Sequence, residues 1–109
     1  MPLKLTTYYH GSDIPELPGN NTFHSIELFH IYEATPGYTP LLIVASEAEK
    51  PVAKLLAAVR KSARLFPPAI IKRCEVYGTG EYFDETIDKE FVFGEMLQRL
   101  TAEALREAF

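Results

Sequence analysis

A short apolar segment in the first half of the chain limits most strongly what this sequence can fold into. Leu41–Ala45, reading Leu-Leu-Ile-Val-Ala, is too short to span a membrane and does not alternate between apolar and polar residues. An unbroken apolar run of this length is typical of a strand covered on both faces by other elements. We therefore expect the rest of the chain to pack around this strand.

A short helix is predicted directly before this strand. Ser25 is a suitable N-cap because its hydroxyl can accept from the free N–H groups of the first turn, and Glu27 places a carboxylate near the positive helix end. Pro36-Gly37 ends the helix. Helical spacing places Leu28, Ile31, Tyr32 and Thr35 on one side of this helix, with Phe29 at the edge of that side.

Further strands are predicted on both sides of these elements. Residues 3–9 favour an edge strand, and the turn-forming residues of 10–22 predict a loop. Residues 52–60 are predicted to form a strand that pairs with the apolar strand, with the polar linker 47–51 as the turn between them. Phe66-Pro67-Pro68 is predicted to end this element. A third strand of the central part is predicted over residues 69–77.

A second helix is predicted near the end of the chain. The acidic residues of 84–88 can cap it, and its apolar stripe is Phe93, Met96, Leu97, Leu100, Ala104 and Ala108. Together these elements predict an α/β (α+β) fold with a mostly antiparallel sheet of three to four strands and two helices.

Bulk properties exclude several classes of protein. The 109 residues suffice for one domain, and no stretch has the length and apolarity of a membrane helix or a signal peptide. Cys74 is the only cysteine, so an internal disulfide is excluded and a buried structural thiol is expected. We expect a cytoplasmic protein without membrane insertion.

Charge is unevenly distributed along the chain, although the net charge is −4. Residues 54–73 contain six bases and no acids, whereas residues 75–109 contain nine acids and three bases. One interpretation is a surface with solvated faces of opposite sign. The other is an anion site at Arg60, Lys61 and Arg64, which for a nucleic-acid binder predicts salt-dependent RNA affinity.

Motifs that carry chemistry are weak in this sequence. His10, His24 and His30 lack the spacing of a metal site and are expected on the surface or in loops, so no metal is assigned. Acids such as Glu85 precede the second helix and are interpreted as caps rather than catalysts. A substrate-binding turn is predicted after the third strand, at Tyr77, Gly78, Thr79, Gly80, Glu81 and Tyr82, because clefts in α/β folds open at strand ends. No catalytic residue is assigned.

The order of elements is similar to a known family. The helix start Phe23-x-Ser25-x-Glu27, the turn Pro36-Gly37-Tyr38, the apolar strand, the hairpin into Lys54-Leu55-Leu56 and the strand ending in Tyr77-Gly78 resemble the first half of a Fem-type (FemAB-like) peptidoglycan aminoacyltransferase. That family belongs to the GNAT (acyl-CoA N-acyltransferase) superfamily. The resemblance covers about residues 20–109.

The resemblance implies a bacterial parent protein that transfers an acyl or aminoacyl group to an amine in peptidoglycan or cell-envelope synthesis. The donor would be acyl-CoA or aminoacyl-tRNA, and nucleic acid would enter only as that tRNA. The superfamily holds its donor at a Gly-rich turn between a later strand and its helix, which has no match here, so no cofactor is assigned to this chain.

The domain boundaries give a further expectation. The helical pattern runs to Phe109, which predicts that residues 1–109 are the amino-terminal part of a GNAT-like domain, truncated at the carboxyl end. Such a segment would be inactive alone, would self-associate and would have the remaining carboxyl-terminal half as its partner. The alternative interpretation is a non-enzymatic α+β module that dimerises through a sheet edge or a helix stripe.

Overall fold

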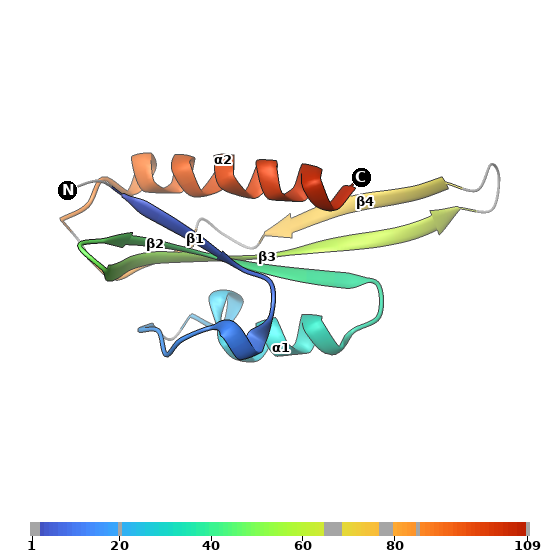
Figure 1. The fold of residues 1–109 in the computed structure, drawn as a ribbon, viewed down its shortest axis with the longest axis horizontal. Coiled ribbons are helices and arrows are strands. Elements are labelled where there is room, and N and C mark those ends of the chain that lie inside the picture. The colour runs from blue at the N-terminus through green and yellow to red at the C-terminus, as the bar shows by residue number, and fades with distance from the viewer. Residues whose placement is uncertain (1–2, 20, 65–68, 77–79, 85, 109) are drawn as a thin grey trace.

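An antiparallel sheet with a helix on each face forms the molecule (Figure 1). The computed structural model describes residues 3–19, 21–64, 69–76, 80–84 and 86–108, and only the backbone of 60–64, 69–75 and 104–108. The elements are β1 (Lys4–Tyr8), α1 (Ile26–Ala34), β2 (Tyr38–Glu47), β3 (Lys50–Arg64), β4 (Ala69–Val76), β5 (Glu81–Tyr82) and α2 (Lys89–Ala108), with 3₁₀ turns at Gly11–Asp13 and Thr22–His24.

The strand order is β1-β2-β3-β4, and all neighbours are antiparallel. The two-residue β5 pairs with β3 at Ala53 and Lys54, whereas β4 pairs with β3 from Ala57 onward. This arrangement confirms the expected α+β class with a mostly antiparallel sheet and two helices. It also confirms the edge strand expected over 3–9 and the hairpin between β2 and β3.

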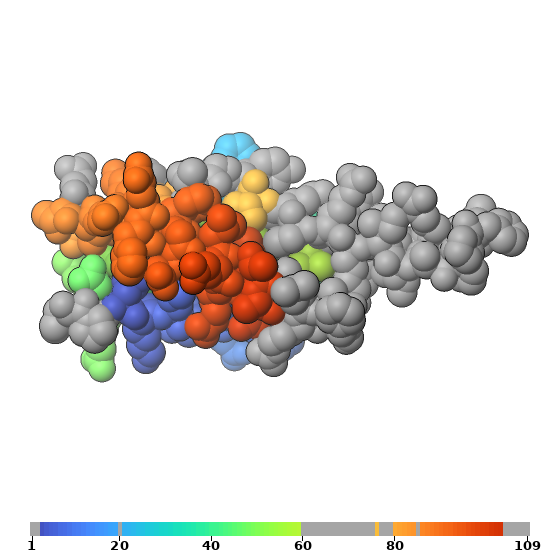
Figure 2. Space-filling view, turned by 90° about the horizontal axis from the view of Figure 1, so that it is seen from above, coloured from blue at the N-terminus to red at the C-terminus, as the bar shows by residue number. Residues whose placement is uncertain are grey.

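Strand β2 is buried on both faces, as its apolar run predicts. Its odd-numbered residues Leu41, Ile43 and Ala45 pack in one cluster with Val92, Met96 and Leu100 of α2. Its even-numbered residues pack in a second cluster on the side of α1, made of Leu42, Val44, Leu56 and Phe29. Figure 2 shows α2, in orange and red, covering the first of these faces.

Helix α1 begins and ends where the sequence predicts. The Ser25 hydroxyl accepts from the N–H of Leu28 at 3.1 Å, and the helix ends at Ala34, before Pro36. The predicted apolar side is wrong, because the helix is rotated about its axis so that Phe29 is fully buried and Ile31 is 61% exposed. The rotation follows from the contacts of Phe29 with the face of β2 and from Glu33, which accepts the N–H of Gly11 at 3.1 Å.

Strands β3 and β4 extend the predicted strands. The β2–β3 turn is short, with Ala48 and Glu49 at positive φ. Strand β3 continues to Arg64, four residues beyond the predicted end, and β4 agrees with the third predicted strand up to Val76. The expected stop at Phe66-Pro67-Pro68 and the strand end at Tyr77 lie outside the described residues.

Helix α2 is capped by Asp88, whose Oδ1 accepts from the N–H of Phe91 at 3.2 Å. Met96 and Leu100 are buried as predicted, but Leu97 is 42% exposed. Val92, which the predicted stripe omitted, is buried in its place because it faces the odd-numbered residues of β2. The side chains of Ala104 and Ala108 lie outside those described. No helix within the described residues is long and apolar enough to cross a membrane.

Candidate functional site

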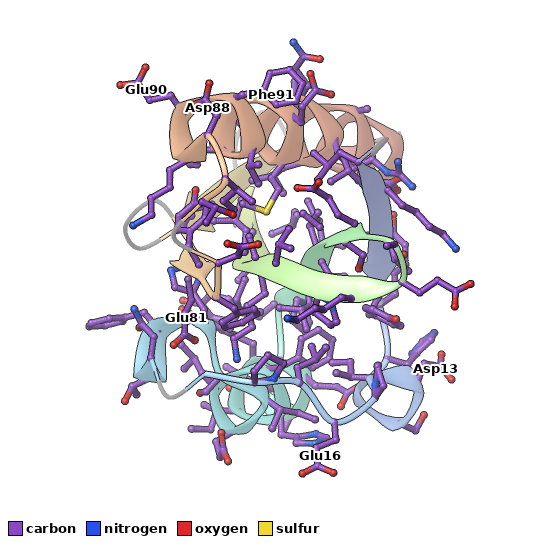
Figure 3. All side chains as sticks on the ribbon, turned by 90° about the vertical axis from the view of Figure 1, so that its left-hand side faces the viewer. Asp13, Glu16, Glu81, Asp88, Glu90 and Phe91 are labelled. Atoms are coloured by element: carbon purple, nitrogen blue, oxygen red, sulfur yellow. The ribbon has the colours of Figure 1, made fainter. Side chains whose placement is uncertain are left out.

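A buried ion pair lies between the sheet and the layer that contains α1. Lys54, on β3, and Glu81, on β5, face each other with Nζ and Oε1 3.5 Å apart, and their side chains are only 7% and 13% exposed. Figure 3 shows Glu81 at this level, between the sheet above it and the α1 layer below it. Charges are expensive to bury, so a pair at this depth is a candidate for function.

The loop before α1 closes over the Glu81 carboxylate. The N–H of Asn21 donates to Glu81 Oε2 at 3.1 Å. Gly19 has φ +105°, and a Cβ built there would lie 2.4 Å from Glu81 Oε1. Glycine is therefore required at this position by both backbone conformation and space.

An aromatic ring lies near the ammonium group of this ion pair. Lys54 Nζ lies 5.8 Å from the centre of the Phe83 ring, a cation–π distance. Phe83 is held in place because its N–H donates to the carbonyl of Val52 at 2.8 Å. The ammonium therefore lies in an environment shielded from bulk water.

His24, at the end of the 3₁₀ turn before α1, is the second buried polar residue at the site, and its burial corrects the expectation of a surface histidine. Its ring is 1% exposed, and its Nδ1 accepts from the N–H of Leu56 at 3.1 Å. Leu56 lies between the stretches of β3 that pair with β5 and β4. Because Nδ1 is an acceptor, the ring is neutral with its proton on Nε2.

A cavity of about 690 Å³ adjoins these residues. Its lining comes from the loop before α1, from the start of α1 and from the sheet: Ile14, Pro15, Glu16, Leu17, Gly19, Thr22, His24, Ser25, Ile26, Glu27, Leu42 and Lys54. In Figure 3, Glu16 lies at the outer edge of the layer below the sheet. The volume is that of a small-molecule pocket, apolar with a few charged groups.

The predicted substrate turn falls partly at this site. Glu81 belongs to the buried ion pair, and Gly80 has φ +98° with a Cβ position 2.9 Å from the carbonyl oxygen of Lys54. The Tyr82 side chain packs on the opposite face of the sheet, in the cluster on the side of α2. Tyr77, Gly78 and Thr79 lie outside the described residues. The predicted anion residues Arg60, Lys61 and Arg64 all lie on β3, beyond the cavity.

The cavity, the burial of Lys54 and the role of His24 were not predicted from the sequence. The available signal for Lys54 was its position as a single charge within the apolar stretch 52–59. No comparable signal marked His24. His10 and His30 are exposed, as expected. In the described part of the chain, no group of three or more His, Cys, Asp or Glu side chains is suited to hold a metal ion.

Comparisons with protein-family models, with curated proteins and with solved structures gave no match to this chain. The site is therefore interpreted from its own geometry and chemistry.

Proposed function

We propose that this chain is the amino-terminal part of a Fem-like acyltransferase of the GNAT type, which transfers an acyl or aminoacyl group to an amine in cell-envelope synthesis. The cavity beside Lys54 would bind the amine acceptor. The observation that supports this proposal best is the set of charges at the cavity.

Carboxylates outnumber cations around the cavity. The exposed residues Glu16 and Glu27 are among the lining residues and Glu81 is paired with Lys54, so three carboxylates accompany one ammonium. The remaining lining is largely apolar. This balance favours a ligand with a cationic amine and an apolar stem over a polyanion such as a coenzyme pyrophosphate. The proposal therefore assigns the acceptor, and not the donor, to this half of the protein.

Lys54 has a role in the transfer step under this proposal. The amine, bound as an ammonium, first gives one proton to a base, because only the neutral nitrogen has a lone pair. That nitrogen attacks the carbonyl carbon of a thioester or ester, a C–N bond forms, and the bond to sulfur or oxygen breaks. The nitrogen loses a second proton to a base, and the leaving group takes up a proton. Negative charge develops on the carbonyl oxygen during attack, and a fixed ammonium in a water-poor site stabilises it. Glu81 and the Phe83 ring hold Lys54 for that purpose.

The outer edge of β4 is where further protein would join. In the register of the described residues, β4 pairs with β3 and with no strand on its other side. Exposed strand edges in proteins are usually paired or covered. We propose that the remaining carboxyl-terminal half of the parent protein, which would also supply the donor site, pairs here.

Acceptor binding can be tested on the 109-residue chain by following backbone amide signals by NMR. The probe is a short peptide with a lysine ε-amine, and the control ligand is the same peptide acetylated on that amine. We expect the free amine to shift the signals of Ser25, Leu42 and Lys54, and the acetylated peptide to shift them much less. Equal effects of both peptides, or shifts that lie elsewhere, would contradict the proposal.

A matched pair of variants locates the interaction. Both Glu27 and Glu90 are exposed; Glu27→Gln removes a carboxylate that lines the cavity, and Glu90→Gln removes one from α2, far from the cavity. Only Glu27→Gln should weaken the peptide. Light scattering tests the alternative, an interaction module: a discrete dimer that forms through the β4 edge, combined with no amine binding, would favour the module.

A further inference from the structure

The β3–β4 hairpin extends beyond the rest of the molecule. Residues 61–64 of β3 and 69–72 of β4 pair with each other after the last pairing of β3 with β2, at Arg60. We call residues 60–64 and 69–73 the arm. Figure 1 shows the arm running past the ends of both helices, and the longest dimension of the molecule is 51 Å against 24 and 21 Å. The arm is therefore available to a partner from several sides.

The strand register of the arm places basic positions opposite basic positions. Arg60 is opposite Arg73, and Lys61 is opposite Lys72. Directly opposed residues of antiparallel strands share one face with their Cβ atoms about 5 Å apart, and like charges in that relation are destabilising. Two such pairs in succession weaken the isolated hairpin. The arrangement is therefore explained better by an anionic partner than by stability.

Both faces of the arm carry basic positions. Strand alternation puts Arg60, Arg64 and Arg73 on the face shared with Leu56, the side of α1. The same alternation puts Lys61 and Lys72 on the face shared with Val59, the side of α2. No acidic residue occurs between Lys50 and Arg73, and the first on the hairpin, Glu75, is opposite Ala58.

We propose that the arm binds double-helical nucleic acid by its phosphates, with the two-stranded ribbon lying in a groove. A groove of double-helical DNA is wide enough for such a ribbon and presents phosphates along both walls. A flat anionic surface, such as a membrane or an acidic protein face, would use basic residues on one side of the ribbon only. The distribution over both faces favours the groove. This inference does not depend on the proposed acyl transfer, but it requires that the outer edge of β4 within the arm stays free of the strand proposed to pair there.

The test measures fluorescence anisotropy of labelled duplexes of about 20 base pairs with the 109-residue chain. A DNA duplex and an RNA duplex of the same sequence distinguish the two sources of the phosphates. For five phosphate contacts we expect affinity to fall by about 100- to 1,000-fold between about 50 and 200 mM salt. Neutralising a contact should flatten the slope of log affinity against log salt by about 1 per residue.

Variants on each face separate a groove from a flat surface. Arg60→Gln/Arg64→Gln/Arg73→Gln and Lys61→Gln/Lys72→Gln should each weaken the duplex and flatten the salt slope. Circular dichroism and thermal unfolding establish that each variant is folded. The matched control, Lys4→Gln/Lys50→Gln/Lys89→Gln, removes three exposed bases elsewhere and should bind like the parent chain.

Three results would overturn the proposal. The first is no salt-dependent binding to either duplex at the lower salt concentration. The second is an equal loss of affinity in the control variant, which would indicate attraction by net charge alone. The third is a loss of affinity in the variant of one face only, combined with tighter binding to anionic phosphatidylserine vesicles than to either duplex. That result would indicate a membrane surface as the partner.

Discussion

The ion pair between Lys54 and Glu81 allows a quantitative test of the site by a double-mutant cycle. At 3.5 Å, two unit charges attract by about 5 kcal/mol if the effective dielectric constant is about 20. Most of that attraction offsets the free energy of removing both charges from water. Removing a single partner leaves the other charge buried and unpaired, and such changes destabilise proteins by about 3–5 kcal/mol.

We therefore expect Lys54→Met and Glu81→Gln each to lower the free energy of unfolding by about 3 kcal/mol. For a chain of this size that corresponds to a fall in Tm of roughly 12–24 °C. Gln at position 81 retains an acceptor for the Asn21 N–H, so the effect reports mainly on charge. The double variant should lose much less than the sum, because neither buried charge remains.

Urea unfolding followed by circular dichroism measures all four corners of the cycle. A coupling free energy of about 2–3 kcal/mol is expected, above the roughly 0.5 kcal/mol of independent sites. Lys50→Met is the control, since it makes the same substitution at an exposed position of the same strand and should change stability by less than about 0.5 kcal/mol. Additive single effects would refute the assignment of a buried, coupled pair.

Three further predictions concern the same region. His24→Leu leaves the buried N–H of Leu56 without its acceptor, so stability should fall by about 1–3 kcal/mol and hydrogen exchange at Leu56 should accelerate; unchanged exchange would contradict this role. Gly80→Ala should lower the free energy of unfolding, measured with a chemical denaturant, by roughly 1–3 kcal/mol because of the positive φ and the nearby Lys54 carbonyl. An unchanged free energy of unfolding would mean that the backbone can shift. The Thr86 hydroxyl and N–H donate to Asp84 and lower its carboxyl pKa. The Asp84 carboxylate therefore stabilises the fold at pH values above its ordinary pKa near 3.8, and this stabilisation is lost as the pH falls through the lowered pKa. Thr86→Ala should raise that pKa towards its ordinary value in an NMR titration, and no change would exclude the hydroxyl as the main cause.

Local sequence patterns predicted the parts of the fold that depend on local chemistry. The unbroken run Leu41–Ala45 identified a strand buried on both faces, and the Ser25 hydroxyl identified the start of a helix. The rotation of α1 could not be predicted, since Phe29 or Ile31 can face the sheet until β2 and the Glu33 contact with Gly11 decide between them.

The candidate site depends on partners that lie far apart in the sequence. Lys54 belongs to a basic segment that one interpretation treats as a solvated face, but its counter-charge Glu81 is 27 positions later on a two-residue strand. The buried His24 ring accepts a hydrogen bond from the backbone N–H of Leu56 on β3, which lies 32 positions later in the sequence. No composition or spacing within either segment contains this information.

The position of the cavity follows from the unequal lengths of the two helices. At about 1.5 Å per residue, α2 with 20 residues is about 30 Å long and α1 with nine is about 14 Å long. Helix α2 can therefore cover its face of the sheet along most of its length, and the buried Glu103 near its end accepts from the Tyr9 hydroxyl that follows β1. Helix α1 leaves part of the opposite face to the loop before it. That loop is held over the sheet by polar contacts such as the one between Asn21 and Glu81, and it does not pack as a regular element. The cavity, with Lys54 in its wall, lies where the short helix stops covering the sheet, so lengthening α1 at its amino end should fill the site without disturbing α2.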